Sequence, residues 1–391
     1  MMFGHGTRDG IVVAVIGMAS VLVVPTAGAV GHDGGMIDLG LLPGGASSMA
    51  TIVGDDGTVV GTAGAADGYG HAVRWQRNGR IADLGTLPGH TQSQVTAMNS
   101  AGDLVGISNA PALVSNFAVR WDRQGRISAM APDVDTSTPV DINDAGQIAG
   151  SVDSMENERA VRWSRDGSIT YLPVLPEAPT SSAAGISERG TVGGIVRSVF
   201  SGGPQYAARW RTGGGLEVLP TYPGGWDVWL AGIDDHDAVV GTFFTDSGQR
   251  AVSWDAAGRI TALRLPPGAT QSVALTLSQD GFVLGWVWTP EGQRAARWDP
   301  SGVLTLLDNA PGSSSANPSG VNDRGEVVGQ VIMPDYTTYA VRWDRGGHVT
   351  VLPRLPGGSY AAASAINDRG ETVGYAITTD LYPHAVIWRR S

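Results

Sequence analysis

The stretch P-G-G-S-Y-A-A-A-S-A-I-N-D-R-G-E-T-V-G at residues 356–374, followed after a short loop by H-A-V-I-W at residues 384–388, decides the fold because the chain repeats it from end to end. An A-x-x-W unit closes each copy about every 45 residues, a spacing typical of propeller blades. In each copy a Pro precedes a turn residue, usually Gly, by 14 residues, as in Pro356 and Gly370. The closing residues are Trp75, Trp121, Trp163, Trp210, Trp254, Trp298, Trp343 and Trp388.

Each copy predicts four short strands. The first ends in an apolar residue before a turn, which reads N-D-R-G at residues 322–325 and 367–370. Asn at the first turn position and Gly at the fourth favour a tight hairpin with a left-handed glycine. The V-V-G, A-V-R-W and V-T-V-L segments that follow are rich in β-branched residues and separated by Gly and Asp, as expected for strands. The sequence therefore predicts an all-β protein.

The two ends of the repeat array are incomplete in complementary ways. Residues 36–39 (M-I-D-L) match a fourth strand, whereas the chain ends just after a third strand at Trp388. A closed ring in which the N-terminal strand completes the C-terminal blade would leave no sheet edge exposed. We therefore expect an eight-bladed β-propeller of four-stranded antiparallel blades, closed by the N-terminal strand.

The first residues have the features of an export signal. Arg8, an apolar core at residues 11–24 and the small residues Ala27 and Ala29 predict a signal peptide over residues 1–29, with an uncleaved anchor as the alternative. Residues 30–391 are then one secreted propeller domain with no membrane contact after cleavage, expected to be a monomer. The chain has no Cys, so packing and closure must stabilise it without crosslinks. A net charge of −11 argues against nucleic-acid binding.

Two repeated positions have expected structural roles. We expect the Trp of each copy to pack between blades. The residue before it is Arg in six copies, and we expect an ion pair with a turn carboxylate such as Asp144, Asp323 or Asp368. A ring of arginines that binds an anionic ligand is the alternative. The N-D-x-G segments have too few oxygen ligands for calcium loops and are interpreted as turns.

The motifs also resemble a known family. H-A-V-R-W at residues 71–75, H-A-V-I-W at 384–388, D-L-G-T-L-P-G at 83–89 and I-N-D-R-G at 366–370 are similar to those of the HAF-type extracellular repeat family of bacteria. The resemblance covers nearly all of the chain after residue 29. It implies a secreted, propeller-like protein, and it implies no reaction and no catalytic residues.

Function is expected where the repeat is broken, because variable loops on a rigid frame carry binding sites. Trp226 and Trp229, with Tyr222 and Asp227 nearby, are predicted at the mouth of the central channel on an innermost strand. Trp286 and Trp288 follow the V-L-G strand of the next copy. Aromatic faces beside carboxylates suit stacking on sugar rings or apolar ligands, and local core filling is the alternative.

Asp141 is the one charged residue at its position in the repeat, and it is expected to face the channel. Paired with Asp227 it could perform acid–base chemistry on a glycoside, or it could merely hydrate the channel. The sequence has no nucleophile elbow, zinc-protease or phosphate-loop motif, and its histidines lack metal-ligand spacing. We thus expect no cofactor or metal, with a metal site built by residues from separate blades as the alternative.

Three functions remain open at this point. The first is a non-catalytic scaffold that binds a polysaccharide, a small molecule or a protein at the channel mouth. The second is a polysaccharide lyase or glycosidase, and the third is an enzyme of secondary metabolism.

Overall fold

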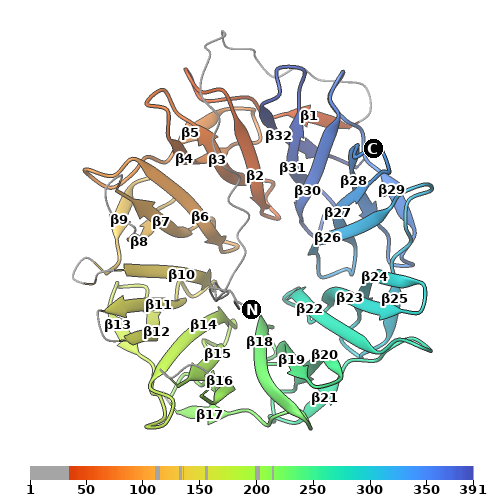
Figure 1. Ribbon diagram of the computed structural model, residues 1–391. Helices are drawn as coiled ribbons and strands as arrows, with labels where there is room; N and C mark the ends of the chain where they lie inside the picture. The colour runs from red at the N-terminus through yellow and green to blue at the C-terminus, as the bar shows by residue number, and fades with distance from the viewer. Residues whose placement is uncertain are drawn as a thin grey trace, which may run out of the picture.

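The computed structural model describes residues 35–390, except 111–114, 132–133, 135, 155–156, 199–202 and 214. The described residues form 32 β-strands and no helix, which confirms the all-β prediction. Accordingly, none of them forms an apolar helix that could cross a membrane. Figure 1 shows the sheets radiating from a common centre. The predicted signal peptide lies outside the described residues.

The strands follow one another in groups of four, from the centre outwards. The innermost strands are β2 (Ser48–Val53), β6 (Gln92–Met98), β10 (Thr136–Ile142), β14 (Thr180–Ile186), β18 (Gly225–Ile233), β22 (Gln271–Leu277), β26 (Ser315–Val321) and β30 (Tyr360–Ile366). The second strands are β3 (Val59–Gly64), β7 (Leu104–Asn109), β11 (Ile148–Ser154), β15 (Val192–Arg197), β19 (Val239–Thr245), β23 (Val283–Thr289), β27 (Val327–Ile332) and β31 (Thr372–Ile377).

The third strands all end at the repeated Trp: β4 (Gly70–Trp75), β8 (Asn116–Trp121), β12 (Asn157–Trp163), β16 (Gln205–Trp210), β20 (Gly248–Trp254), β24 (Gly292–Trp298), β28 (Thr338–Trp343) and β32 (Pro383–Trp388). The outermost strands have three residues each: β5 (Ile81–Asp83), β9 (Ile127–Ala129), β13 (Ile169–Tyr171), β17 (Leu216–Val218), β21 (Ile260–Ala262), β25 (Leu304–Leu306), β29 (Val349–Val351) and β1 (Met36–Asp38). Such short outer strands offer little free edge for pairing with another chain.

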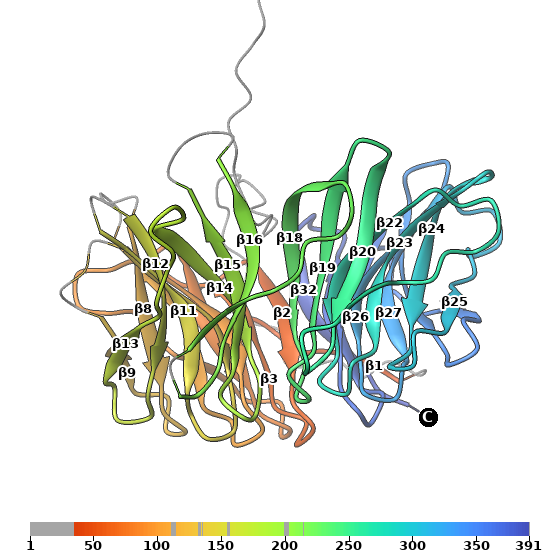
Figure 2. The ribbon, with the colours of Figure 1, turned by 90° about the horizontal axis from the view of Figure 1, so that it is seen from below.

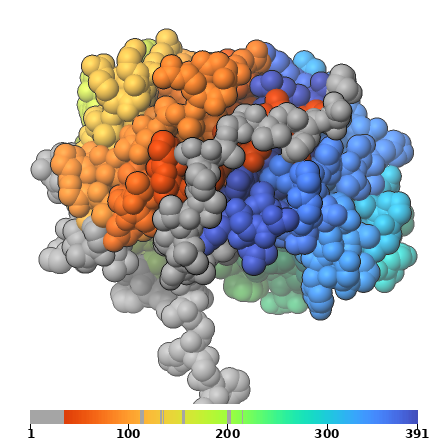
Figure 3. Space-filling view, turned by 90° about the horizontal axis from the view of Figure 1, so that it is seen from above, coloured from red at the N-terminus to blue at the C-terminus, as the bar shows by residue number. Residues whose placement is uncertain are grey.

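Six of the sheets have four antiparallel strands, and a single parallel bridge between Thr338 and Tyr360 joins β26–β29 to β30–β32. Strand β1 pairs with β32, so that Met36 lies opposite Trp388 and Asp38 opposite Val386. Figure 3 shows the red and orange N-terminal strands lying against the dark blue C-terminal strands.

The glycine of each V-G segment is required by a bulge in the innermost strand. In the last sheet the register shifts between Ala363 and Ala365, opposite Gly374. A Cβ on Gly374 would overlap the carbonyl oxygen of Ala362. The bulge increases the local twist of the strand, and only glycine tolerates the close approach of the two backbones.

The predicted hairpin turns are confirmed. The N–H of Gly370 donates to the carbonyl of Asn367 (2.9 Å), and the φ angle of Gly370 is 77°. Asn367 also donates through Nδ2 to the carbonyl of Gly54, in the turn of the β2–β5 sheet, at 2.9 Å. These turns therefore bond to one another as well as closing their own hairpins.

The repeated tryptophans form the core between sheets, as predicted. Each is at most 3% exposed. Most also donate through Nε1 to a carbonyl of the preceding sheet, as Trp121 does to Leu84 at 2.8 Å. The indole thus supplies both apolar volume and a hydrogen bond between neighbouring sheets.

The predicted ion pairs of the repeated Arg with Asp144, Asp323 and Asp368 do not form among the described residues, although Arg120 pairs with Asp103, directly after its own turn glycine, at 3.0 Å. Other repeated arginines bond to backbone carbonyls. Arg162, for example, donates to the carbonyls of Gly190 (2.9 Å) and Thr212 (3.3 Å) in the next sheet. The long side chain reaches the turns of that sheet, where backbone carbonyls remain available. The proposed acidic partners Asp144, Asp323 and Asp368 instead accept backbone N–H bonds from the preceding sheet's turn, at 2.8, 2.7 and 2.9 Å.

Candidate functional site

The molecule has two ends at which the strands are joined, as Figure 2 shows from the side. We call one the connector end: it carries the loops from each outermost strand to the next sheet and the loops between second and third strands. The other, the turn end, carries the N-D-x-G turns and the turns between third and outermost strands. The predicted aromatic site lies at the connector end of the β18–β21 sheet.

Strand β18 is longer than the other innermost strands. It has nine residues, against six or seven elsewhere, and its register shifts twice against β19. The first shift, between Gly225 and Asp227, leaves Trp226 as the extra residue of a bulge. A bulge redirects a side chain away from the sheet. The irregularity therefore places Trp226 outside the packed interface between sheets.

Trp226 and Trp229 are the two exposed tryptophans among the described residues, at 61% and 45% exposure. The Trp226 ring contacts the ring of Phe244 on β19, with centroids 5.8 Å apart and planes inclined by 43°. Phe244 therefore supports one side of Trp226, while most of the residue remains exposed to solvent. Two exposed indoles three positions apart on one strand are more than a singly scattered apolar residue, and they indicate a contact surface.

The other two residues predicted here have supporting positions. Tyr222 is half-buried, and its ring lies 6.3 Å from that of Phe243, which belongs to the core of this sheet. Asp227 accepts the backbone N–H of Val228 through Oδ1 at 2.9 Å. Tyr222 therefore anchors the loop that leads into β18. Asp227 lies between the two exposed tryptophans in the sequence and supplies a carboxylate there.

Trp286 does not join this surface. It is half-buried and packs against the core between the β22–β25 and β26–β29 sheets, which includes Leu284 and Val331. This is the core-filling alternative of the sequence analysis. Trp288 is half-buried at the position of β23 that Phe244 occupies in β19, opposite Gln271. The exposed aromatic surface thus consists of Trp226 and Trp229.

Asp141 joins two sheets. Its Oδ1 accepts the N–H of Ile142 (2.8 Å), and its Oδ2 accepts the N–H of Ile186 in the next sheet (3.0 Å). Burial raises the pKa of the Asp141 carboxyl, although both backbone bonds oppose this. Two backbone donors on one carboxylate give Asp141 a structural role at the bulge of β10.

Asp141 and Asp227 do not face each other. Each innermost strand has a bulge near its turn end, and Asp141 follows that bulge in β10 as Gly232 does in β18. Asp227 and Gly232 lie opposite Phe244 and Val240, so they are four paired positions apart, about 13 Å along the strand direction. One whole sheet, β14–β17, also lies between the two strands. Glycosidase carboxylates lie within about 10 Å of each other, so these two residues do not form such a pair.

Within the described part of the chain, no group of three His, Cys, Asp or Glu side chains is arranged to hold a metal ion. Two histidines have carboxylate partners instead. His71 Nδ1 lies 2.9 Å from Asp83, and His384 Nδ1 lies 2.9 Å from Asp38. In both cases the aspartate is on the outermost strand beside the histidine's own strand, so these pairs fasten that strand to its sheet.

Sequence comparison does not identify the family: no protein-family model and no curated protein matches the chain. Solved structures match its fold. A prolyl endopeptidase aligns with a TM-score of 0.58 and 11% identity, over 84% of this chain and 54% of its own. Dipeptidyl peptidase 4 of Porphyromonas gingivalis aligns with a TM-score of 0.53 and 10% identity, over 80% of this chain and 56% of its own. A puromycin hydrolase mutant aligns with a TM-score of 0.50 and 13% identity, over 94% of this chain and 58% of its own.

The chain spans little more than half the length of these three peptidases and hydrolases. At such low identity the likeness concerns the fold alone. The matches include peptidase propeller domains, and the four-stranded antiparallel sheets described above are the form of propeller blades. The chain is therefore built on a β-propeller scaffold.

Proposed function

We propose that this protein is a secreted, non-catalytic propeller of eight blades, closed by β1, that binds a carbohydrate chain at the connector end. Closure is supported by the pairing of β1 with β32 and by the hydrogen bond that the backbone N–H of Ala385 donates to Ser48 Oγ (2.9 Å). Membership of the HAF-type family and export are supported by the motifs and by the N-terminal pattern of the sequence.

The exposure of Trp226 and Trp229 is the observation that carries the binding proposal. Together the two indoles leave a large apolar area in water, and a folded monomer gains nothing from it. Indole faces stack on the C–H faces of sugar rings, and a neighbouring carboxylate such as Asp227 accepts hydrogen bonds from sugar hydroxyls. A single chain of linked sugars fits two separated rings on one strand better than a small compact ligand does.

The test is retention on a panel of immobilised polysaccharides. The wild-type protein should be retained on at least one, and Trp226→Ala with Trp229→Ala should abolish retention. Tyr171→Ala is the matched control, because Tyr171 is 49% exposed but lies on an outermost strand of another sheet. Equal retention of the wild type and the double tryptophan variant would contradict the proposal.

Closure has a separate test, because the chain has no Cys of its own. Ile37 and Ile387 lie directly opposite each other in the β1–β32 pair. Opposed residues of an antiparallel pair have the Cα separation that a disulfide needs. Ile37→Cys with Ile387→Cys should therefore form a disulfide that raises the Tm, whereas Ile37→Cys with Ile127→Cys should not. Free thiols in the first variant after oxidation would contradict closure.

The enzyme alternatives receive no support from the described residues. Asp141 is bonded to the backbone of two sheets, and Asp227 lies far from it along the strand direction.

A further inference from the structure

A cavity of about 470 Å³ opens at the turn end, between the β22–β25 and β26–β29 sheets. It is far from the exposed tryptophans, which lie at the connector end of another sheet. Three arginines contribute to its lining, together with one aromatic ring and two carboxylates: Arg297, Arg324, Arg345, Phe282, Asp299 and Asp323. Its volume is in the range of small-ligand sites.

Arg297 brings to this cavity a buried charge that forms no ion pair with the described residues. It is one of the repeated arginines and only 5% exposed. Comparison with the β6–β9 sheet shows what is missing. There the equivalent Arg120 forms an ion pair of 3.0 Å with Asp103, the residue after the turn glycine. In the β22–β25 sheet that position is Phe282, whose ring centroid lies 5.6 Å from the Arg297 guanidinium.

The polar partners of Arg297 are neutral. Its guanidinium donates to the carbonyls of Gly325 and Arg345 and to the hydroxyl of Thr305. Its Nε has no hydrogen-bond partner in the described structure. Burial is the main cause that lowers the pKa of Arg297, and the positive charge of the neighbouring Arg345 adds to the lowering. The carboxylates of Asp299 and Asp344 act in the opposite direction. A buried guanidinium without a carboxylate favours an anion beside it.

Arg324 and Arg345 add two further cations at the rim. Both are exposed, and neither side chain forms an ion pair with any described residue. Three unpaired guanidinium groups therefore surround one cavity in a protein whose net charge is −11. The planar guanidinium matches a carboxylate or a phosphate through paired hydrogen bonds.

The carboxylates of the lining narrow the choice of ligand. Asp299 Oδ1 accepts the bonds of its own turn, and Asp323 Oδ1 accepts the N–H of Asp280 at 2.7 Å. The Oδ2 atom of each accepts no bond from the described residues, so both can accept hydroxyl groups of a ligand. They would also repel a dianion such as phosphate. Phe282 offers an apolar edge.

We propose that this cavity binds a hydroxylated monocarboxylate, a sugar acid or a uronic acid unit, with its carboxylate on Arg297, Arg324 and Arg345 and its hydroxyls on Asp299 and Asp323. The site is independent of the tryptophan surface at the other end of the molecule.

Titration calorimetry with D-galacturonate tests the assignment, with D-galactose as the matched ligand without a carboxylate and inorganic phosphate as the simple anion. Galacturonate should bind saturably, and galactose and phosphate should each bind at least tenfold more weakly. Arg324→Gln and Arg345→Gln should each weaken galacturonate binding at least tenfold. Arg369→Gln, in the identical N-D-R-G turn of the β30–β32 sheet and outside the cavity lining, should leave it within twofold.

Saturable binding of galactose or phosphate as tight as that of galacturonate would overturn the proposal, as would an equal loss in Arg369→Gln or no saturable binding of galacturonate. A trimer of galacturonate distinguishes two sources of the ligand. If the trimer binds more tightly than the monomer, the natural ligand is part of a polymer, and if the two bind equally, it is a free sugar acid. Both results support a hydroxylated monocarboxylate as the ligand class. Trp226→Ala should leave galacturonate binding unchanged, so this site and the tryptophan surface can fail separately.

Discussion

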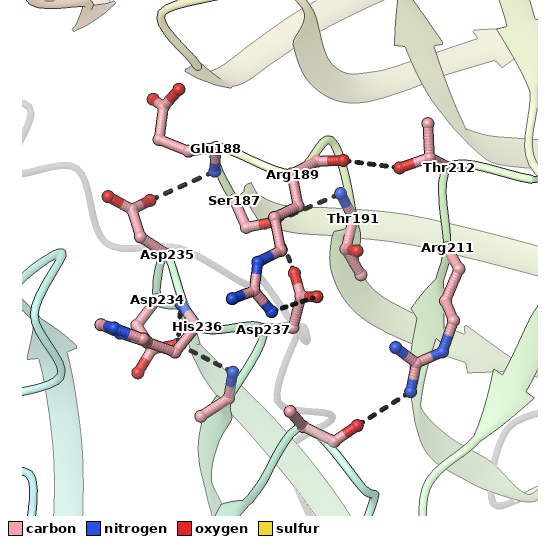
Figure 4. A network of polar contacts seen from close by, with 12 residues as sticks. Ser187, Glu188, Arg189, Thr191, Arg211, Thr212, Asp234, Asp235, His236 and Asp237 are labelled. Carbon is pink, nitrogen blue, oxygen red and sulfur yellow. Dashed lines mark hydrogen bonds and ion pairs between the residues drawn. The ribbon is translucent and has the colours of Figure 1, made fainter.

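Ser187 Oγ donates a hydrogen bond of 2.6 Å to Oδ1 of Asp237, and this bond joins the turns of the β14–β17 and β18–β21 sheets (Figure 4). Both residues are buried. Asp237 occupies the turn position that is glycine in every other copy, and its φ angle is 65°. An aspartate in the left-handed region is costly, and the bond to Ser187 compensates for that cost.

Ser187→Ala should lower the free energy of unfolding by about 1–3 kcal/mol, because it removes a hydrogen bond from a buried carboxylate. Urea unfolding followed by tryptophan fluorescence measures this. Ser278→Ala is the control: it changes the same turn position in the β22–β25 sheet, where the hydroxyl accepts only the N–H of Phe282 at 3.3 Å. Equal losses in the two variants would contradict a bond specific to Asp237.

Burial should separate two arginines that share partners. Arg209 and Arg211 both contact Glu217 and both donate to the carbonyl of Ala256. The Arg209 side chain is fully buried, whereas that of Arg211 is 47% exposed. We expect Arg209→Gln to cost about 3 kcal/mol, since it leaves buried carbonyls unpaired, and Arg211→Gln to cost less than about 1 kcal/mol. Similar losses in chemical denaturation would show that the buried contacts add nothing.

The indole hydrogen bond between sheets can be measured by comparing two tryptophans. Trp121 Nε1 donates to the carbonyl of Leu84 at 2.8 Å, whereas Trp75 Nε1 is buried and has no hydrogen-bond partner among the described residues. Substitution by Phe removes similar volume at both positions. Trp121→Phe should therefore cost about 1 kcal/mol more than Trp75→Phe in urea unfolding. A larger loss for Trp75→Phe would contradict this.

The pair of His384 and Asp38 should make stability depend on pH. The hydrogen bond that His384 Nδ1 donates to the Asp38 carboxylate raises the pKa of His384. Burial acts in the opposite direction, and the nearby Asp380 adds to the rise. A raised pKa in the folded state means that the stabilisation is complete below the unfolded value of about 6.5 and is lost as the pH rises through the folded value. The amount by which the Tm of the wild type exceeds that of His384→Gln should therefore decrease as the pH is raised from 6 to 9.

His348→Gln is the control for this series. His348 also lies near a carboxylate, Asp308, at 3.2 Å, but its side chain is 76% exposed. A surface pair of this kind contributes little. A pH-dependent difference as large for His348→Gln as for His384→Gln would show that the effect does not come from the β1–β32 junction.

The repeat made much of the fold predictable. The spacing of the tryptophans and the fixed interval from Pro to Gly predicted the strands, the turns and the buried indoles. The partners of the arginines could not be predicted in the same way. Arg162 bonds to Gly190 and Thr212 because neighbouring sheets pack at one particular distance, and no property of a single copy encodes that distance.

The candidate site was predictable where a residue breaks the repeat and remains exposed. Trp226 and Trp229 meet both conditions, whereas Trp286 breaks the repeat but fills a gap between sheets. The cavity beside Arg297 was missed. Its signal in the sequence is Phe282, a large apolar residue directly after a turn glycine, where the β6–β9 sheet has the partner of Arg120.

The bond between His384 and Asp38 connects residues 346 positions apart in the sequence. Contacts of such long range raise the contact order, and they form only after a large entropic cost has been met. During synthesis Met36–Asp38 must therefore remain without its partner until the ribosome has made β32. A premature stop that removes only the final strand would leave two unpaired edges, and the shortened product should aggregate instead of persisting as a slightly smaller fold.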